Sequence, residues 1–387
     1  MTRSIRDQTA IVGIGQTPLV SKGGLPEDEL TLACLAISAA IDDAGVSPAE
    51  VDGLALFDME AKREVEVARN LGLGDITFFA EVGYGGGAAC GTVGHAAMAV
   101  AAGQCDVAVA WRARKRADKR TRVWSQSPKR LDDPDQWTRP AGLLRPVDEI
   151  AMLTRRYMHE YGVTREQLAN VPLAFRRHAN RNPKAAMYGR ELDLETYLSA
   201  RWISEPLCLY DNCLESDGAL AVVVTSAERA RDLPRKPVYV HAYAQGLPRQ
   251  HQTMSSFFCE DPLRGPSHAA ARRLWANSDF APKDISCAQI YDAFSPLIPL
   301  SLEGYGFCER GEGAAFTEDG GLEWDRGRLP VNTSGGSLSE AYVHGFNHVL
   351  EAVLQLRGES TCQVPNASSC LVTSGECVPT SALVLRS

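Results

Sequence analysis

Cysteine is the first residue type in this 387-residue sequence that could do chemistry, because eleven cysteines occur in it. A thiolate is a strong nucleophile, and close cysteine pairs hold zinc or form disulfides. The number is odd, the cysteines are scattered, and no two of them have the spacing C-x-x-C. Disulfide frameworks and zinc sites both need regular pairs. We therefore expect a reduced, cytoplasmic protein without a metal site, in which most cysteines are core residues.

A second chemical signal is the basic run at residues 112–122, RARKRADKRTR. Such a run could contact nucleic acid, anionic lipid or a phosphate-bearing ligand. The whole chain has a formal net charge of −8, whereas a nucleic-acid-binding protein usually carries a positive excess. We interpret the run as a solvated loop or as a patch for an anionic ligand such as the phosphates of coenzyme A, and we expect no nucleic-acid partner.

Composition excludes several further classes of protein. Hydrophobic residues make up 44% of the chain and charged residues 23%, which is typical of a globular protein. No apolar run approaches the ~20 residues that a membrane span needs. The chain starts MTRSIRD, which has no apolar signal core, so we expect no secretory peptide. At roughly 150 residues per domain, the length suggests two or three domains or two fused halves.

The elements that must position reactive residues occur twice along the chain. In each half, a short buried strand that ends in a glycine turn precedes an apolar-faced helix. These strand and helix pairs are residues 9–18 with 30–46, and residues 237–248 with 267–280. Each helix is followed by a proline, an acidic residue and a strand that ends in aromatic-Asp. Pro48 thereby aligns with Pro282, and Phe57 aligns with Tyr291, without a gap.

The repeat continues through a second helix in each half, at residues 88–103 and 343–356, with Gly103 as the expected C-cap of the first. Further buried strands are expected at residues 106–110, within 209–230, at 367–372 and at 381–385. Alternating strands and helices favour an α/β fold with a mainly parallel sheet. Because the repeat is long and occurs only twice, we predict a duplicated domain with halves at residues 1–235 and 236–387.

An insertion at about residues 113–205 interrupts the first half. It begins charged and rich in proline and then becomes helical, and Thr164 followed by Gln167 is typical of a helix start. Long insertions are often functional. We hold two interpretations of this one, a lid or subdomain over a ligand site and a plain dimerisation loop.

Several motifs resemble those of the thiolase superfamily, in its lipid-transfer or sterol-carrier branch. They are residues 161–168 (YGVTREQL), Ala179 with Asn182-Pro183, Asp211 followed by residues 216–219 (SDGA), and residues 332–336 (NTSGG). The resemblance covers nearly the whole chain. It implies a duplicated five-layer α-β-α-β-α fold with a mid-chain loop and helical insertion, a homodimer, and an acyl-CoA thioester as the substrate with no further cofactor.

The sequence departs from that family where the nucleophile belongs. Thiolases place a reactive cysteine at the N-terminus of a buried helix, where the thiol pKa is lowered. The corresponding stretch here is Gly85-Gly86-Gly87. Cys90 follows a few residues later, either as a shifted nucleophile or, as we prefer, as a small apolar helix residue. The glycines leave room for a ligand or let backbone N–H groups approach it.

Two tyrosines stand at other catalytic positions of the family. Tyr342 occupies the place of the family's histidine, and Tyr291 opens the strand-end motif Tyr-Asp-Ala-Phe. His344 lies two residues after Tyr342, a shift that on a helix would point it elsewhere. Cys377 does not align cleanly with the family's acid/base cysteine. Tyr243, at the end of a repeated strand, is a third candidate by pseudo-symmetry.

Two phenols without a nucleophile favour retro-aldol cleavage over acyl transfer, because acyl transfer needs a covalent carrier. Cleavage of a β-hydroxyacyl-CoA needs a base for the hydroxyl, a stabilised thioester enolate and a proton donor to carbon. We predict Tyr291 as base and Tyr342 as acid, with the reverse assignment open, and His344 and Tyr243 as supporting residues. The predicted backbone sites for the thioester or enolate are Gly86, Gly335, Gly336 and Gly375.

The tyrosine contexts resemble most closely those of the steroid side-chain-cleaving aldolases of this branch. That resemblance implies cleavage of a 17-hydroxy-3-oxo-pregnene-20-carboxyl-CoA to an androstenedione-type 17-ketone and propionyl-CoA. It also implies a partner protein with a zinc-ribbon and an OB-fold domain. Two other functions stay open: a true thiolase (acetyl-CoA acyltransferase) that uses Cys90 or another cysteine, and a non-catalytic subunit that carries lipid or acyl-CoA.

Overall fold

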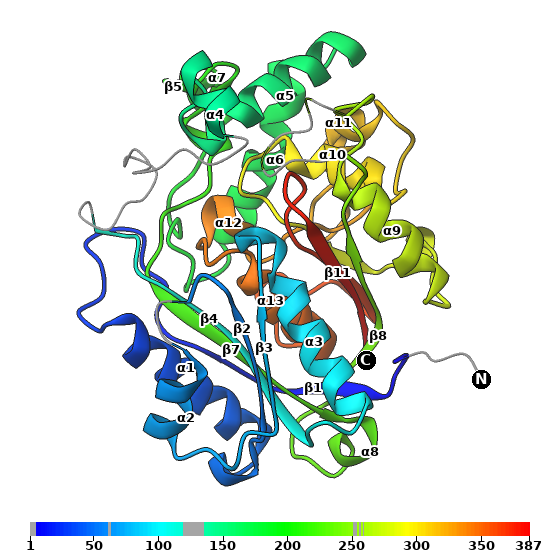
Figure 1. Cartoon of the computed structure of the whole chain (residues 1–387). Coiled ribbons are helices and arrows are strands. Elements are labelled where there is room, and N and C mark those ends of the chain that lie inside the picture. The colour runs from blue at the N-terminus through cyan, green and yellow to red at the C-terminus, as the bar shows by residue number, and fades with distance from the viewer. Residues whose placement is uncertain (1–4, 61–62, 119–134, 251–253, 255–256, 258) are drawn as a thin grey trace.

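A nine-stranded sheet runs through the whole molecule (Figure 1). The computed structural model describes residues 5–60, 63–118, 135–250, 254, 257 and 259–387. The strand order is β3-β2-β4-β7-β1-β8-β11-β10-β9. These strands are β1 (Thr9–Gln16), β2 (Gly53–Phe57), β3 (Phe78–Val82), β4 (Val107–Arg114), β7 (Gly218–Ser226), β8 (Val238–Gly246), β9 (Cys287–Gln289), β10 (Ser369–Thr373) and β11 (Thr380–Arg386). A separate hairpin contains β5 (Trp202–Ser204) and β6 (Leu207–Cys208).

The predicted repeat is visible in the strand pairing on either side of the central β1/β8 pair. The antiparallel pairs β1/β7 and β7/β4 correspond to β8/β11 and β11/β10, and parallel β4/β2 corresponds to β10/β9. The expectation of a mainly parallel sheet is wrong, because only three of the eight neighbouring pairs are parallel. β10 and β11 are joined by a short loop, and such a loop can join only antiparallel neighbours.

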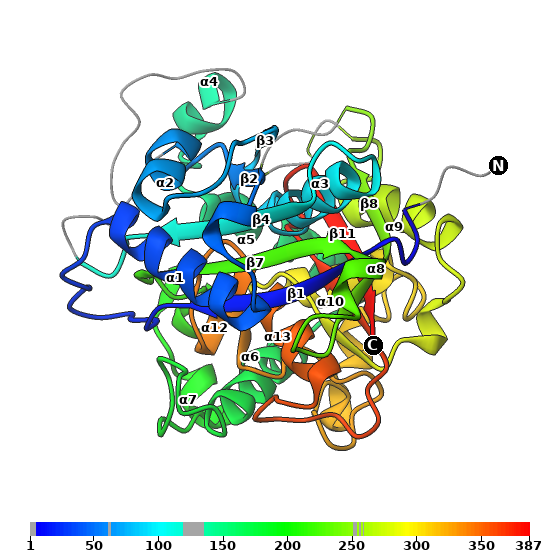
Figure 2. The ribbon, with the colours of Figure 1, turned by 90° about the horizontal axis from the view of Figure 1, so that it is seen from below.

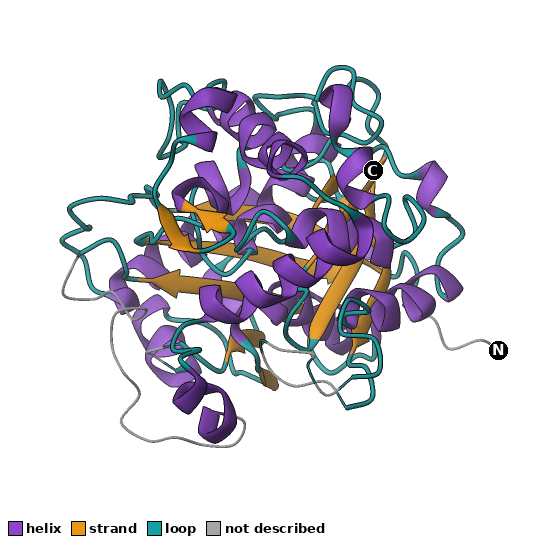
Figure 3. Cartoon of the chain, turned by 90° about the horizontal axis from the view of Figure 1, so that it is seen from above, coloured by secondary structure: helices purple, strands orange, loops and turns teal. Residues whose placement is uncertain are grey.

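Helices form three layers around the two halves of the sheet (Figures 2 and 3). The middle layer contains α3 (Ala89–Ala101) and α13 (Phe346–Arg357), each of which packs against strands of both halves. One outer layer contains α1 (Glu29–Ala44) and α2 (Glu64–Leu71), and the other contains α9 (Pro266–Ala276) and α10 (Leu297–Gly304). The largest apolar core lies around the middle helices. This arrangement confirms the duplicated five-layer fold.

Helix ends follow local sequence signals. Asp28 caps α1 by accepting a hydrogen bond from the Thr31 N–H, and left-handed Gly45 ends that helix. Gly103, predicted as the C-cap of α3, is left-handed but follows the cap residue Ala102. The predicted helix at residues 343–356 begins only at Phe346, because His344 and Gly345 both have positive φ angles.

The described part of the insertion forms a helical cap at the top of Figure 1. It contains α4 (Asp135–Thr138), α5 (Pro146–Tyr161), α6 (Arg165–Ala179) and α7 (Leu194–Leu198). Thr164 and Gln167 form a reciprocal capping box at the start of α6, as predicted. Short helices elsewhere are α8 (Ala227–Ala230), α11 (Gly313–Phe316) and α12 (Gly336–Ser339). Among the described residues, no helix is long and apolar enough to span a bilayer.

The first residues of the basic run belong to a buried strand and not to the solvated loop that we considered. β4 extends to Arg114, and the side chains of Arg112 and Arg114 lie inside the molecule with exposures of 1% and 2%. Alternation along the strand and the neighbouring polar side chains explain the burial of these arginines, which the charge pattern alone does not reveal. The end of the run, residues 119–122, lies outside the described residues.

Candidate active site

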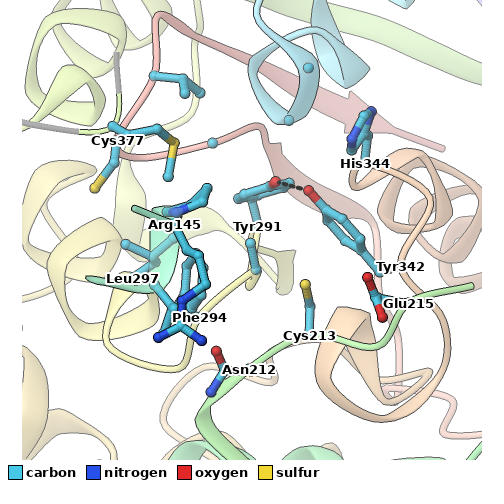
Figure 4. Close-up of a pocket in the computed structure, with 18 of the residues that line it drawn as sticks. Arg145, Asn212, Cys213, Glu215, Tyr291, Phe294, Leu297, Tyr342, His344 and Cys377 are labelled. Carbon is cyan, nitrogen blue, oxygen red and sulfur yellow. Dashed lines mark hydrogen bonds between the residues drawn. The ribbon is translucent and has the colours of Figure 1, made fainter. Parts of the chain in front are cut away.

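A cavity of about 740 Å³ is lined by residues of the helical cap and of both halves of the chain (Figure 4). Its lining is mostly apolar, with Val147 from α5, Phe294 and Leu297 from the second half, and Cys377 from the loop before β11. Such a volume and lining are typical of a site for a small organic ligand. The described part of the insertion therefore lies over a candidate ligand site, which favours the interpretation as a lid or subdomain.

Tyr291 and Tyr342 meet on the wall of this cavity, and their hydroxyl oxygens are 2.8 Å apart (Figure 4). Tyr291 follows β9, and its N–H donates to Thr373 Oγ1 at 3.1 Å. Tyr342 lies between α12 and α13, and its N–H donates to Ser216 Oγ at 3.0 Å. The structure thus brings together the two residues that the sequence predicted as acid and base.

Asp292 connects the two segments that carry these tyrosines. Its carboxylate accepts hydrogen bonds from the N–H groups of Ser337 at 2.9 Å and Leu338 at 3.2 Å, at the start of α12. It also contacts His348 Nε2 of α13 at 2.9 Å. Asp292 and His348 were not singled out from the sequence. The aromatic-Asp pattern at the ends of both repeated strands was a signal that could have indicated Asp292.

Burial raises the pKa of both phenols. Burial and the hydrogen-bonded neighbour Tyr342 hold the pKa of Tyr291 well above its usual range. The pKa of Tyr342 is also raised, first by burial, but nearby Arg114 and the hydrogen bond from Tyr291 oppose that rise. Both hydroxyls are therefore protonated at neutral pH.

The structure separates the four predicted glycines. Gly86 and Gly375 line the cavity, and the Gly375 N–H donates to the Gly86 carbonyl at 2.8 Å. A Cβ at Gly86 would lie 2.0 Å from Tyr291 Oη, so this glycine leaves the room that the phenol occupies. Gly335 and Gly336 lie outside the cavity wall, at the start of α12, where a Cβ at Gly336 would meet Asp292. Their predicted role as enolate donors does not fit this placement.

His344 lines the cavity, contrary to the expectation that it points elsewhere. That expectation assumed a helix, but His344 has a φ of +52° and lies before α13 begins. Burial and the neighbouring arginines hold the pKa of His344 well below its usual range, so its imidazole is neutral at pH 7. Tyr243 lies in the core, where its ring contacts His95 edge-on, and it is not among the cavity-lining residues.

The cysteines at and near the site are poor nucleophiles. Cys90 is fully buried on α3, its thiol donates to the Val372 carbonyl at 3.4 Å, and burial raises its pKa to about 12. Cys377 and Cys213 line the cavity, and burial raises the pKa of both thiols. Cys213 was not singled out from the sequence. Within the described ranges, no group of His, Cys, Asp and Glu side chains could hold a metal ion.

Family models of thiolases match both halves of the chain. The model of the thiolase N-terminal domain matches residues 9–228, and the model described as thiolase C-terminal domain-like matches residues 249–385. The chain therefore belongs to the thiolase family.

Individual relatives indicate which activity within the thiolase family this chain is similar to. A 17-hydroxy-3-oxo-4-pregnene-20-carboxyl-CoA lyase of Mycobacterium tuberculosis is 46% identical over 98% of this chain and 99% of its own length. A steroid side-chain-cleaving aldolase of Thermomonospora curvata is 46% identical over 97% of both chains. The solved structure of an Ltp2-ChsH2(DUF35) aldolase superposes with a TM-score of 0.93 at 45% identity, covering 99% of this chain and 98% of that one. Similarity of this extent supports an aldolase activity as well as the thiolase fold.

Proposed function

We propose that the protein is a carbon–carbon lyase that cleaves a 17-hydroxy-3-oxo-pregnene-20-carboxyl-CoA into a 17-keto steroid and propionyl-CoA. The observation that carries this proposal is the pair of phenol hydroxyls, 2.8 Å apart on the wall of an apolar cavity. The full-length similarity to a lyase and an aldolase named for this chemistry supports the substrate class. Cys90, the nearest thiol to the family's nucleophile position, faces the core.

The hydrogen-bonded pair can act as a proton relay. In one concerted relay, the proton of the C17 hydroxyl passes to Tyr291, the proton of Tyr291 passes to Tyr342, and the proton of Tyr342 passes toward C20 as the bond between C17 and C20 breaks. C17 becomes the ketone, and the electron pair of the broken bond enters the thioester enolate. The proton from Tyr342 completes propionyl-CoA at C20, and both phenols end the relay neutral. This route needs no free phenolate at neutral pH, in agreement with the raised pKa values of both tyrosines.

The cavity suits a bulky apolar acyl group attached to a polar carrier. Phe294, Leu297 and Ile203 supply apolar wall, and Arg145 and Arg201 supply positive charge to the lining. Apolar surfaces bind a rigid ring system through burial, while cations favour phosphate groups. We assign the steroid ring system to the apolar wall and the coenzyme A phosphates to Arg145 and Arg201. This assignment replaces the interpretation that the basic run binds these phosphates, because the first arginines of that run are buried in β4.

We further propose that the protein works in the cytoplasm as a homodimer together with a partner of the zinc-ribbon and OB-fold type. The similar solved structure, an Ltp2-ChsH2(DUF35) aldolase, carries a ChsH2(DUF35) component in its name, which supports a partner of that kind. Co-expression with candidate partners, followed by mass measurement of the purified assembly, tests the homodimer and the partner.

The deciding experiment incubates the purified complex with the 17-hydroxy-20-carboxyl-CoA in D₂O. We expect the 17-ketone and propionyl-CoA in equal amounts, with one deuterium at C2 of the propionyl group, because the enolate carbon takes its proton from a solvent-exchanged phenol. The matched control substrate lacks the 17-hydroxyl and should remain intact. Release of acetyl-CoA with a trapped acyl-cysteine would instead indicate a thiolase, and tight binding without turnover would indicate a carrier.

A further inference from the structure

Arg114 is a buried cation directly behind the tyrosine pair. Its guanidinium carbon lies 6.0 Å from the ring centroid of Tyr342, at the limit of a cation–π contact. Its Nη1 lies 2.5 Å from Nε2 of His344, and the imidazole in turn lines the cavity. Arg114 itself is not among the cavity-lining residues, whereas both of these neighbours are.

This cation has no anionic partner in the described part of the chain. The Nε of Arg114 has no hydrogen-bond partner there, and no carboxylate of the described residues lies within ion-pair distance of its guanidinium. Arg112 on the same strand differs, because it forms a 2.7 Å ion pair with the buried Glu60. Burial, together with the repulsion from Arg112, lowers the pKa of Arg114 to about 10. Keeping a buried charge unpaired is costly, so its retention calls for a functional reason.

Backbone geometry also holds this arrangement. A φ of +52° at His344 is uncommon for a residue other than glycine and costs of order 1 kcal/mol. That conformation places the imidazole between two cations, since Arg112 Nε lies 3.2 Å from Nδ1, and the neutral ring accepts a hydrogen bond from Arg114 in the tautomer that keeps its proton on Nδ1. Its ring also stands edge-on to Tyr342, with the centroids 5.3 Å apart. The strained residue thus connects the cations of β4 to the proton-donating phenol.

We propose that Arg114 is a positioning residue that stabilises the negative charge developing on Tyr342 as this phenol donates its proton to the substrate carbon, with His344 holding the guanidinium in place. The inference rests on the proposed function, because that reaction makes Tyr342 the proton donor. A fixed cation beside a developing anion in a water-poor site lowers the barrier without reorganising during the reaction.

The charges around Tyr342 favour this role. After burial, the largest influences on the pKa of its hydroxyl come from Cys213, Arg114, Tyr291 and Arg112. Among these four, only the arginines are charged at neutral pH, and both are positive. Glu215 lines the same cavity and adds a carboxylate to its wall. Removing the Arg114 charge should therefore make Tyr342 a weaker acid.

The test combines kinetics with a titration that needs no turnover. We expect Arg114→Gln to lower kcat about 100-fold and to leave KM within about twofold, as when one preorganised donor to a developing oxyanion is removed. Arg114→Lys keeps the charge and should recover most of kcat. With 3-fluorotyrosine at position 342, the fluorine signal should titrate at higher pH in Arg114→Gln than in the parent protein.

Arg357→Gln is the matched control, because Arg357 is also a buried arginine but pairs with Asp43 at 2.7 Å, away from the cavity. It should leave kcat and the fluorine titration of position 342 unchanged. If Arg114→Gln does not fold, His344→Asn takes its place, with the same rise in the titration expected. An unchanged titration in the folded variant overturns the proposal, even where kcat falls. Failure of the parent complex to release ketone would instead refute the proposed function.

Discussion

The two halves of the molecule use the same position of the repeat for different purposes. Phe57, at the end of β2, is fully buried, packs under the Arg112 guanidinium at 5.1 Å and stacks with His344. Its counterpart Tyr291 follows β9 and donates or accepts a hydrogen bond at the cavity wall. The first half supplies the cations and their apolar support, and the second half supplies the hydroxyls. Duplication has therefore produced a twofold scaffold with one reactive end.

The loops before the two middle helices differ in the same way. Before α3 the chain runs through Gly85-Gly86-Gly87, which have no side chains, although Tyr84 just before them lines the cavity. Before α13 it carries Tyr342 and His344, which both line the cavity. A Cβ at Gly85 would lie 3.8 Å from His344 Cε1, so the side chains of one loop occupy the space that the other leaves.

The largest expected effect comes from making the second half resemble the first. Tyr291→Phe places at that position the residue that its counterpart already has, and Tyr342→Phe removes the other hydroxyl. We expect each to lower kcat by about 10³-fold, since proton transfer by a positioned group contributes about 10²–10⁴-fold. Steady-state ketone release measures the effect. Tyr243→Phe, in the core, is the control and should retain activity within about twofold; full activity of both site variants would refute the relay.

Adding a side chain to the glycine loop before α3 should have the next largest effect on kcat. Gly86→Ala puts a methyl group 2.0 Å from Tyr291 Oη, so the phenol must move out of hydrogen-bond range of Tyr342. We expect kcat to fall about 100-fold, as displacements of about 1 Å at a reacting group commonly cause. Gly83→Ala is the control, because its Cβ meets only the Asp58 carboxylate, at 3.3 Å. Equal activity of the two variants would show that Gly86 is not needed for the site.

The sequence allowed the repeat and the tyrosine pair to be predicted, because both depend on local order. Pro48 and Pro282 open matching 3₁₀ turns, and the aligned strands occupy matching places in the sheet. Tyr291 and Tyr342 each align with a catalytic position of the family, and this alignment alone predicted that the two residues share one site. The mainly parallel sheet was wrong because strand direction at β7 and β11 depends on connections that periodicity does not encode.

The rest of the site could not be predicted because it depends on tertiary geometry. His344 turns into the cavity through one left-handed residue, which no periodic pattern indicates. Arg114 belongs to a charged run in the sequence, and only the sheet shows that its side chain is buried. Gly335 and Gly336 match a family motif, but their place at the start of α12 is set by the contacts of Asp292.

Two glutamates, one buried and one exposed, give a smaller contrast between the halves. This contrast should appear in the pH dependence of the free energy of unfolding. Burial raises the pKa of Glu340 in the second half to about 8, whereas a backbone hydrogen bond within the exposed turn lowers that of Glu50 in the first. An unfolded glutamate has a pKa near ~4.3. Between that value and pH 8, the folded protein therefore keeps a proton on Glu340 that the unfolded chain releases, so stability falls as pH rises through this window.

Thermal unfolding at pH 5, 6.5 and 8 checks this difference. Glu340→Gln should flatten the decline in melting temperature with rising pH, because glutamine has no proton to release. Glu50→Gln should leave the slope unchanged, since the stabilisation from Glu50 is lost only as pH falls below its unfolded pKa of ~4.3. A Glu340→Gln slope equal to that of the parent protein would show that this carboxyl ionises normally in the fold.

The smallest effect is expected at Cys90, the first-half residue nearest to the family's nucleophile position. Its thiol lies on the buried face of α3 and donates to a backbone carbonyl of β10, so it cannot reach the cavity without moving the helix. Cys90→Ala should retain kcat within about twofold while losing about 1 kcal/mol of stability from the small void. Cys213→Ala is the variant for comparison, because the Cys213 thiol lies at the cavity wall, where a ligand can contact it. A tenfold loss of ketone release in Cys90→Ala alone would mean that the first half still takes part in the chemistry, and that the division of labour between the halves is incomplete.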